Sequence, residues 1–390
     1  MTHQKQDSNV FGVVMELLTE AGFEKFAEAF RILLNESMKA ERSVALGAEL
    51  HERSPERLGY ANGYKPKAVA TRMGEMTFAV PQVRDGVDFY PSALEKGLRS
   101  ERALKVAIAQ MYVEGVSTRK VTQIVEKLCG CQVSSSQVSR AAALLDEELS
   151  RWRTRPLGAF PYLALDARYE KVRHAGSVVS CAVLIAVGVQ ENGKRCVPGV
   201  SVSLSEAEVH WREFLKGLQE RGLHGVTYIV SDGHKGLKAA LDARFAGVPW
   251  NRCQFHIAQD AMQYVPKVEM RKEVGRDLRD IFDAPDRPEA ERRLHLAVEK
   301  YRDKAPKLSE WMEANVPEGF TVFMLPPEHR KKMRTTNMLE NLNNIIRRRT
   351  RVASLFPNEE SLLRLVTAVL MEVSEEWETG KVYLTMKPEN

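Results

Sequence analysis

The sequence has little cysteine and no long hydrophobic run. Its 5 cysteines among 390 residues are irregularly spaced, so we expect a reducing compartment rather than a disulfide framework. The longest uncharged apolar run, residues 178–189, is shorter than the roughly 20 residues that a membrane helix needs. The amino-terminal residues are polar, so we expect no secretory signal. A cytoplasmic protein that contacts no membrane is therefore predicted.

The composition is that of an ordinary globular protein. Hydrophobic residues make up 44% of the chain and charged residues 28%, which excludes a wholly disordered or collagen-like protein. A chain of 390 residues is long enough for two or three domains, each with its own core.

Positive charge is concentrated in one window, residues 329–352. This window contains eight basic residues and a single acid, Glu340, so its net charge is +7. Because the whole chain has a net charge of +5, the other residues together carry −2. A concentrated positive field attracts polyanions such as DNA. The alternative is a solvated helix face. The basic residues are Arg330, Lys331, Lys332, Arg334, Arg347, Arg348, Arg349 and Arg351.

The first part of the chain divides into three regions. Residues 1–58 are predicted to be helical, because apolar residues recur there at spacings of three and four. Residues 59–100 alternate glycine and proline with short β-prone pieces, which indicates a small β-prone arm. Residues 101–152 are helical again and resemble a helix-turn-helix.

Helix boundary signals support the helix-turn-helix interpretation. Ser117 is expected to cap one helix, Gly130 to end it, and Ser134 to cap the next. Gln137 and Arg140 would then lie near the outer face of the second helix, where such side chains hydrogen-bond base edges or phosphates. The alternative is a plain helical hairpin with a polar surface.

From residue 162 onward the pattern predicts an α/β fold, a mixed sheet flanked by helices. Strands are expected at 162–166 and 226–232, and each of these two ends in an acid, Asp166 or Asp232. Acids at strand ends lie at the edge of a sheet, where ligands bind, so the two aspartates would lie side by side if their strands are neighbours. Further strands are expected at 178–189 and 196–204.

A third acid lies on a predicted helix just after the first basic residues. Glu340, Asn343 or Asn344, and Arg347 share one face of that helix, so the carboxylate can face the two aspartates. Three carboxylates beside a basic cluster suit phosphoryl transfer assisted by two Mg²⁺ ions. Because the chain has 52 acidic residues, spacing alone leaves open that these three are unrelated.

Seven sequence blocks in order carry a family resemblance. They are Asn62-Gly-Tyr64 with Thr71-Arg-Met-Gly74, Pro81-Gln-Val-Arg-Asp-Gly86, Met111-Tyr112 with Gly115-Val-Ser-Thr-Arg119, Asp166-Ala-Arg-Tyr169 with Lys171-Val-Arg173, Ser231-Asp-Gly-His-Lys-Gly236, Arg252-Cys-Gln-Phe-His256, and Thr336-Asn-Met-Leu-Glu340 through Arg347-Arg-Arg-Thr-Arg-Val352 to Phe356-Pro-Asn-Glu-Glu360. With these blocks the chain resembles the bacterial Mutator-type insertion-sequence transposases, from about residue 55 to 370.

The resemblance implies a particular domain order. A ribonuclease H-like catalytic core would occupy 153–256 and 321–375, with a mostly helical insertion at 257–320 and a tail at 376–390. The mostly helical DNA-binding region would precede it.

The resemblance also implies site residues. Asp166, Asp232 and Glu340 would form an Asp-Asp-Glu triad, the same acids that the strand and helix patterns indicate. We expect DNA contacts from Gln137, Arg140, Arg168, Lys171, Arg173, Arg347, Arg348, Arg349 and Arg351.

Cys253 and His256 match the Cys/Asp-x-x-His signature of the family. By itself this spacing is half of a zinc site, but no second ligand pair stands at metal spacing. We expect His256 to contact DNA or to order the catalytic pocket, and Cys253 to pack. The Arg-Asn pair that follows in many members is missing at residues 257–260. His234 is expected either to support the triad or to cap a helix.

The sequence therefore predicts a transposase that binds the terminal inverted repeats of its own element. It would nick DNA and transfer a strand with two Mg²⁺ ions, or Mn²⁺ in their place. Its partners would be double-stranded DNA, at the ends and at the target, and other copies of the chain in a homodimer or higher oligomer. Two alternatives remain, a catalytically silent DNA-binding protein derived from a transposase and a ribonuclease H-like nuclease that cuts without joining.

Overall fold

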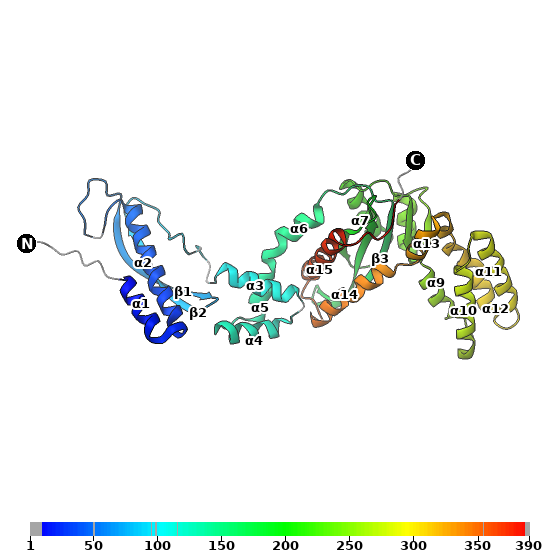
Figure 1. The fold of residues 1–390 in the computed structure, drawn as a ribbon, viewed down its shortest axis with the longest axis horizontal. Coiled ribbons are helices and arrows are strands. Elements are labelled where there is room, and N and C mark those ends of the chain that lie inside the picture. Colours follow the sequence, from blue (N-terminus) through cyan, green and yellow to red (C-terminus); the bar gives the residue numbers. More distant parts are fainter. Residues whose placement is uncertain are drawn as a thin grey trace, which may run out of the picture. The chain divides into compact units, whose positions relative to one another are not determined.

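The computed structural model describes residues 10–49, 51–94, 96–97, 100–114, 116–353 and 355–386. The chain divides into two compact units, Met1–Leu145 and Asp146–Asn390, each of which is described by itself (Figure 1). No helix in these described ranges is both long and apolar enough to cross a membrane.

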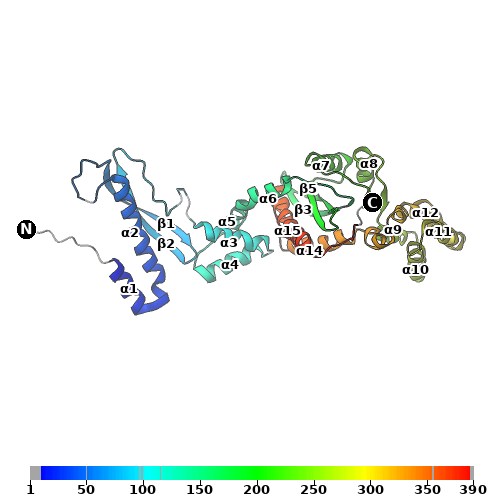
Figure 2. The same ribbon diagram turned by 45° about the horizontal axis from the view of Figure 1, so that its top comes forward.

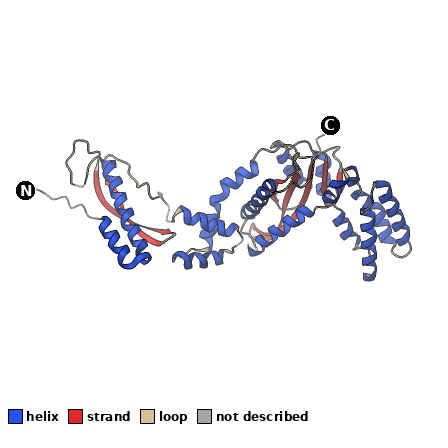
Figure 3. Cartoon of the chain, in the orientation of Figure 1, coloured by secondary structure: helices blue, strands red, loops and turns tan. Residues whose placement is uncertain are grey.

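The first unit begins with a helical hairpin packed on a β-hairpin (Figure 3). Its core includes Met38, Phe78 and Val80, which are buried between the long helix and the strands. The helical region and the small β element predicted from the sequence are both present. The elements are α1 (Val10–Ala21), η1 (Gly22–Lys25), α2 (Phe26–Leu46), β1 (Tyr60–Thr71) and β2 (Gly74–Arg84), and the two strands are antiparallel.

Three short helices complete the first unit, and the boundaries predicted at Ser117, Gly130 and Ser134 are confirmed. Ser117 accepts a hydrogen bond from the Lys120 N–H, and Gly130 adopts the left-handed conformation (φ 63°) that ends the helix. Ser134 and Gln137 form a reciprocal capping box at the start of the next helix. The helices are α3 (Arg102–Val113), α4 (Thr118–Cys129) and α5 (Ser135–Ala142), followed by η2 (Ala143–Leu145).

Helix α6 (Asp146–Thr154) belongs by its contacts to the second unit, although the sequence pattern grouped it with the helices before it. Arg364 donates to Asp146 across a 2.5 Å ion pair, and Arg153 donates to Thr367. Both partners lie on α15 (Glu359–Thr379).

A five-stranded mixed sheet forms the centre of the second unit (Figure 2). Its strand order is β5-β4-β3-β6-β7. Strands β3, β4 and β5 are antiparallel neighbours, and β6 and β7 run parallel to β3. The sequence pattern ended β3 at Asp166, which is wrong, because the strand continues eight residues further, to His174. The strands are β3 (Tyr162–His174), β4 (Ser177–Val189), β5 (Arg195–Ser203), β6 (Tyr228–Ser231) and β7 (Trp250–Arg252).

Helices cover both faces of this sheet because the strand side chains alternate. Leu163 and Leu165 pack with Trp211 on the face covered by α7 (Glu208–Glu220) and α8 (Lys235–Arg244). On the opposite face Ala164 belongs to the core that holds Leu342 and Val366, which lie on α14 (Asn337–Ala353) and α15. The sheet is thus the middle of three layers.

A group of helices with its own apolar core lies in sequence between β7 and α14. Leu278, Leu294 and Leu308 are among its buried residues. The elements are α9 (Gln254–Ala261), η3 (Val268–Met270), α10 (Arg271–Phe282), α11 (Arg287–Tyr301), α12 (Pro306–Asn315), η4 (Val316–Gly319), η5 (Thr321–Met324) and α13 (Pro327–Met333).

Candidate functional site

Asp166 and Asp232 lie at equivalent positions of two neighbouring parallel strands. The register pairs Leu165 of β3 with Ser231 of β6, so the next residue of each chain segment is an aspartate. β6 ends at this point, whereas β3 continues, and Asp232 therefore begins the loop that leads to α8. The sheet register thus brings together two acids that are 66 residues apart in the sequence.

Asp166 is an almost buried carboxyl group, with 9% exposure. Its Oδ1 accepts a hydrogen bond from the Ala167 N–H (2.9 Å), and its Oδ2 accepts one from the Asn343 side chain (2.8 Å). Burial, followed by the charge of Asp232, raises the pKa of Asp166 to about 6. The second acid has a contact of its own. Asp232 Oδ1 accepts a hydrogen bond from the His234 N–H (3.2 Å), and this bond stabilises the loop that leads to α8.

Helix α14 brings Glu340 to the same side of the sheet. Asn343, one turn after Glu340, is the residue that binds Asp166, so this face of the helix is directed at β3. Arg168 donates to the backbone oxygen of Asn343 and also to Glu170, which strengthens the contact between helix and strand. Glu340 Oε1 is buried and has no hydrogen-bond partner among the described residues.

The three acids suit a hard divalent cation. In the part of the chain that the structure describes, no three acidic, histidine or cysteine side chains converge closely enough to form a complete metal site. Asp166 and Asp232 nevertheless repel each other, and the buried oxygen of Glu340 lacks a partner. A cation would relieve both, and carboxylate oxygens are the ligands that Mg²⁺ prefers. The donor set therefore fits Mg²⁺.

Cys253 links strand β7 to the start of α14. Thr336, which immediately precedes that helix, donates from its N–H and its hydroxyl to the fully buried Cys253 Sγ, each at 3.4 Å. Burial opposes ionisation of this thiol, but contacts with His256 and Thr336 outweigh it and lower its pKa. Cys253 is thus buried as expected, and it also anchors the helix that carries Glu340.

His256 lies in the electrostatic field of both aspartates. Its contact with Cys253 raises its pKa to about 9 against the effect of burial, and the charges of Asp166 and Asp232 act in the same direction. Its Nδ1 is buried without a hydrogen-bond partner among the described residues. A protonated imidazole at this position would partly neutralise the acidic pair.

Glu206 is a further acid near the site that sequence reasoning missed. It is only 9% exposed, and its Oε2 lies 3.7 Å from His234 Nδ1. Burial raises its pKa, as does the charge of Asp232, while His234 lowers it. His234 stands at the start of α8 but makes no capping bond with its side chain, so it pairs with Glu206 instead. The signal that could have identified Glu206 is its place just past a strand, as for Asp232.

The basic residues expected to contact DNA differ in their surroundings. Arg168 is bound to Asn343 and Glu170 inside the protein, with only 14% of its side chain exposed, whereas Lys171 and Arg173 are exposed on β3. Arg349 pairs with Glu372 at 3.6 Å. The remaining arginines of this run, Arg347, Arg348 and Arg351, are exposed and line a polar hollow.

In the first unit, Gln137 and Arg140 are exposed on α5. The Gln137 Oε1 accepts a hydrogen bond from the Ser134 N–H (2.7 Å). A bidentate contact with adenine would need this same oxygen. Base reading by Gln137 would therefore compete with the helix cap.

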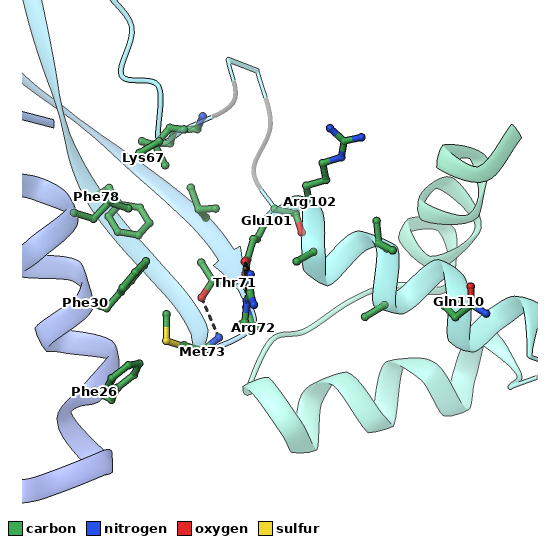
Figure 4. Close-up of a pocket in the computed structure, with 18 residues that line it drawn as sticks. Phe26, Phe30, Lys67, Thr71, Arg72, Met73, Phe78, Glu101, Arg102 and Gln110 are labelled. Carbon is green, nitrogen blue, oxygen red and sulfur yellow. Dashed lines mark hydrogen bonds and ion pairs between the residues drawn. The ribbon is translucent and has the colours of Figure 1, made fainter. Parts of the chain in front are cut away.

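The first unit also contains an apolar hollow of about 1190 Å³ (Figure 4). Phe30 of α2, Phe78 of β2 and Val106 of α3 are among its lining residues. The ion pair between Arg72 and Glu101 lies in its wall. None of the predicted site residues lines it.

Comparison with known proteins identifies relatives over nearly the whole chain. The family model for transposases of the Mutator family matches residues 3–380. The chain is 55% identical to the transposase for insertion sequence element IS406 of Burkholderia multivorans, over 98% of this chain and 99% of that protein. It is 43% identical to the transposase for ISRM5 of Rhizobium meliloti, over 92% and 90% of the two chains. A transposase for IS256 in transposon Tn4001 of Staphylococcus aureus is 36% identical, over 88% and 89%.

These matches cover the elements that bear Asp166, Asp232 and Glu340. The resemblance carried by the seven sequence blocks is therefore confirmed at the level of the family. The chain belongs to the Mutator family of transposases.

Proposed function

We propose that this protein binds the terminal inverted repeats of an insertion sequence and catalyses Mg²⁺-dependent DNA nicking and strand transfer. Asp166, Asp232 and Glu340 are the catalytic acids. The observations that carry the proposal are the pairing of β3 with β6 and the contact of α14 with β3. Strand register aligns the two aspartates, and the Asn343 bond directs this face of α14 toward Asp166. The relatives are themselves named as transposases of insertion sequences.

The sheet supports a ribonuclease H-like core as the scaffold of this chemistry. Three antiparallel strands are followed by two parallel strands, and the acids lie where the parallel part begins. The helices from α9 to α12, with a core of their own, fit the helical insertion between the second aspartate and the glutamate.

The acids would hold two Mg²⁺ ions, or Mn²⁺ in their place, and bound ions of this kind activate the attacking oxygen and stabilise the leaving oxygen. The chain's own groups orient the acids. Asn343 fixes Asp166, the His234 N–H fixes Asp232, and the bond between Cys253 and Thr336 fixes the start of the helix that bears Glu340.

The remaining parts would hold DNA. We place recognition of the ends in the helix-turn-helix-like region, where Gln137 and Arg140 are exposed. We place phosphate contacts on the exposed basic residues of β3 and α14. Because strand transfer brings element ends and target DNA together, we propose a homodimer or higher oligomer on DNA.

The decisive experiment is product analysis with purified protein, Mg²⁺ and a DNA that carries the element's ends. We expect nicks at the ends, followed by joined products. Binding without cleavage would identify a silent DNA-binding protein, and cleavage without joining would identify a nuclease. Either result would overturn the proposal.

A further inference from the structure

A polar hollow of about 650 Å³ lies between α14 and α15, with one wall from the start of β5. It is formed entirely within the second unit. Its lining residues include four arginines, two asparagines, a tryptophan and a single acid. These are Arg195, Arg347, Arg348, Arg351, Asn341, Asn344, Trp377 and Glu376.

The hollow lies along the same helix as Glu340. Asn344, Arg347 and Arg351 follow Glu340 by four, seven and eleven residues, so all four lie in one row along the helix. A strand whose reacting phosphate lay beside Glu340 would therefore meet the arginines as it left the site.

The chemistry of the lining favours a nucleic acid strand. Among the described residues, Arg347, Arg348 and Arg351 form no ion pair, whereas the neighbouring Arg349 is paired with Glu372. Trp377 lines the hollow, and Arg195 stacks on it with the guanidinium 4.2 Å from the ring centroid. Positive groups that follow a backbone, combined with an aromatic surface for bases, are how proteins hold single strands.

The size of the hollow and its amide groups favour one unpaired strand over a duplex. A volume of about 650 Å³ is that of a small-ligand pocket, which accepts a short piece of one strand. Asn341 and Asn344 are exposed amides that can bond the Watson–Crick edges of bases, and a duplex hides those edges.

We propose that this hollow binds an unpaired DNA strand that leads away from the scissile phosphate. Arg347, Arg348 and Arg351 contact its phosphates, and Asn341, Asn344 and Trp377 contact its bases. This inference rests on the proposed function, because it assumes that Glu340 is catalytic. It adds a subsite that handles DNA after the strands have separated.

The test compares two DNA probes on the full-length protein. One probe is a 15-nucleotide oligothymidylate, and the other is a fully paired duplex of the element's end. The double variant Asn341→Ala/Asn344→Ala should weaken binding of the single strand by about fivefold to tenfold and leave binding of the duplex within about twofold. Asn337→Ala is the matched control, because Asn337 is exposed on the same helix but does not line the hollow.

A second measurement does not depend on a substitution. A single strand that carries bromodeoxyuridine should crosslink under ultraviolet light to the peptide that contains Trp377, and excess unlabelled single strand should compete. An unchanged single-strand affinity in the double variant, an equal loss for both probes, or crosslinks confined to other peptides would overturn the inference. A wild-type protein that crosslinks as expected but neither nicks nor joins would contradict the proposed function and leave the strand site standing.

Discussion

The side chain of Asn343 donates a 2.8 Å hydrogen bond to Oδ2 of Asp166. This bond joins α14 to β3, two elements that are far apart in the sequence, and it leaves the Asn343 Oδ1 without a partner among the described residues. Because Glu340 lies one turn before Asn343, the bond also sets the face on which Glu340 lies. The geometry of the proposed triad thus depends on an amide outside it.

The first prediction concerns the three acids. Asp166→Asn, Asp232→Asn or Glu340→Gln should each abolish nicking and joining. The amide keeps nearly the same side-chain shape but removes a negative charge that would hold Mg²⁺. Binding of end DNA should stay within about twofold, since binding rests on other contacts. Cleavage and gel-shift assays check this, with Asp242→Asn on the exposed side of α8 as the control. An acid whose amide variant joins ends at the wild-type rate does not belong to the triad.

The second prediction concerns stability without metal. Asp166 has a pKa raised from 3.8 to about 6 in the folded protein, so the folded state holds its proton more tightly than the unfolded state does. The resulting stabilisation is complete below pH 4 and is lost as pH rises through 6. At pH 7.5 the free energy of unfolding of Asp166→Asn should therefore exceed that of wild type by up to about 3 kcal/mol. At pH 4 the two proteins should have the same free energy of unfolding.

The partner groups allow this substitution. The unpaired Asn343 Oδ1 can accept from the new amide once the Asn343 side chain turns over. Urea unfolding in the presence of a chelator measures the difference, and Asp242→Asn should show none at either pH. A destabilised Asp166→Asn at pH 7.5 would mean that the buried charge does not strain the fold.

Local patterns predicted the elements well where a run of similar residues or a cap marks them. Runs of β-prone apolar residues revealed β4 and β5, and the cap signals at Ser117, Gly130 and Ser134 act on nearby residues, so they can be recognised without tertiary context. The continuation of β3 was missed because its second half is partly exposed and charged, as at Glu170. The three-residue strand β7 carries too few side chains to show a period.

The alignment of the two aspartates was predictable from the sequence, but the contacts of the groups around them were not. Asp166 and Asp232 each follow an apolar run that was predicted to be a strand. Because acids at the ends of neighbouring strands meet at one edge of a sheet, the two could be expected to lie side by side. The link between Cys253 and Thr336 joins residues 83 positions apart, and neither residue type signals the other. Such contacts arise from packing of distant segments, which a single sequence does not encode as a local pattern.

The third prediction concerns that link. Cys253→Ala removes the acceptor for both Thr336 donors, so the start of α14 should loosen and the rate of nicking should fall about tenfold or more, with end binding unchanged. Cys253→Asp keeps an acceptor, and it is the other residue of the family signature, so it should recover most of the rate. Cys181→Ala, equally buried in the same core but on β4, is the control. Equal rates for the alanine and aspartate variants at position 253 would reduce Cys253 to a packing residue.

The fourth prediction concerns the basic run. Neutralising Arg347, Arg348, Arg349 and Arg351 together should flatten the slope of log K against log salt by up to about 0.9 for each phosphate that the protein no longer neutralises. The decrease in affinity should be similar for end DNA and random duplex, since phosphate contacts carry no sequence information. Arg349→Ala alone should contribute little, because Arg349 is held by Glu372. Titrations at several salt concentrations measure the slopes, and an unchanged slope in the quadruple variant would make this run an ordinary solvated face.

The fifth prediction places end recognition in the first unit. A fragment that ends at Leu145 should bind terminal repeat DNA in preference to random DNA without metal, because the unit has its own cores and helix α5 suits a major groove. Ending there leaves α6 with the second unit, where Asp146 pairs with Arg364. Footprinting and competition binding measure the preference, and a fragment that protects no terminal sequence would assign recognition to the second unit.

Gln137→Glu separates base reading from helix capping in that fragment. The carboxylate can still accept from the Ser134 N–H, so the cap survives, but the amide donor that would pair with adenine is gone. Combined with Arg140→Ala, it should remove roughly 1–3 kcal/mol of discrimination between terminal and random DNA. Gln137→Ala, by contrast, should also lower the melting temperature of the fragment, because it breaks the capping box. If the Gln137→Glu/Arg140→Ala fragment keeps its full preference, these two side chains serve the helix rather than the DNA.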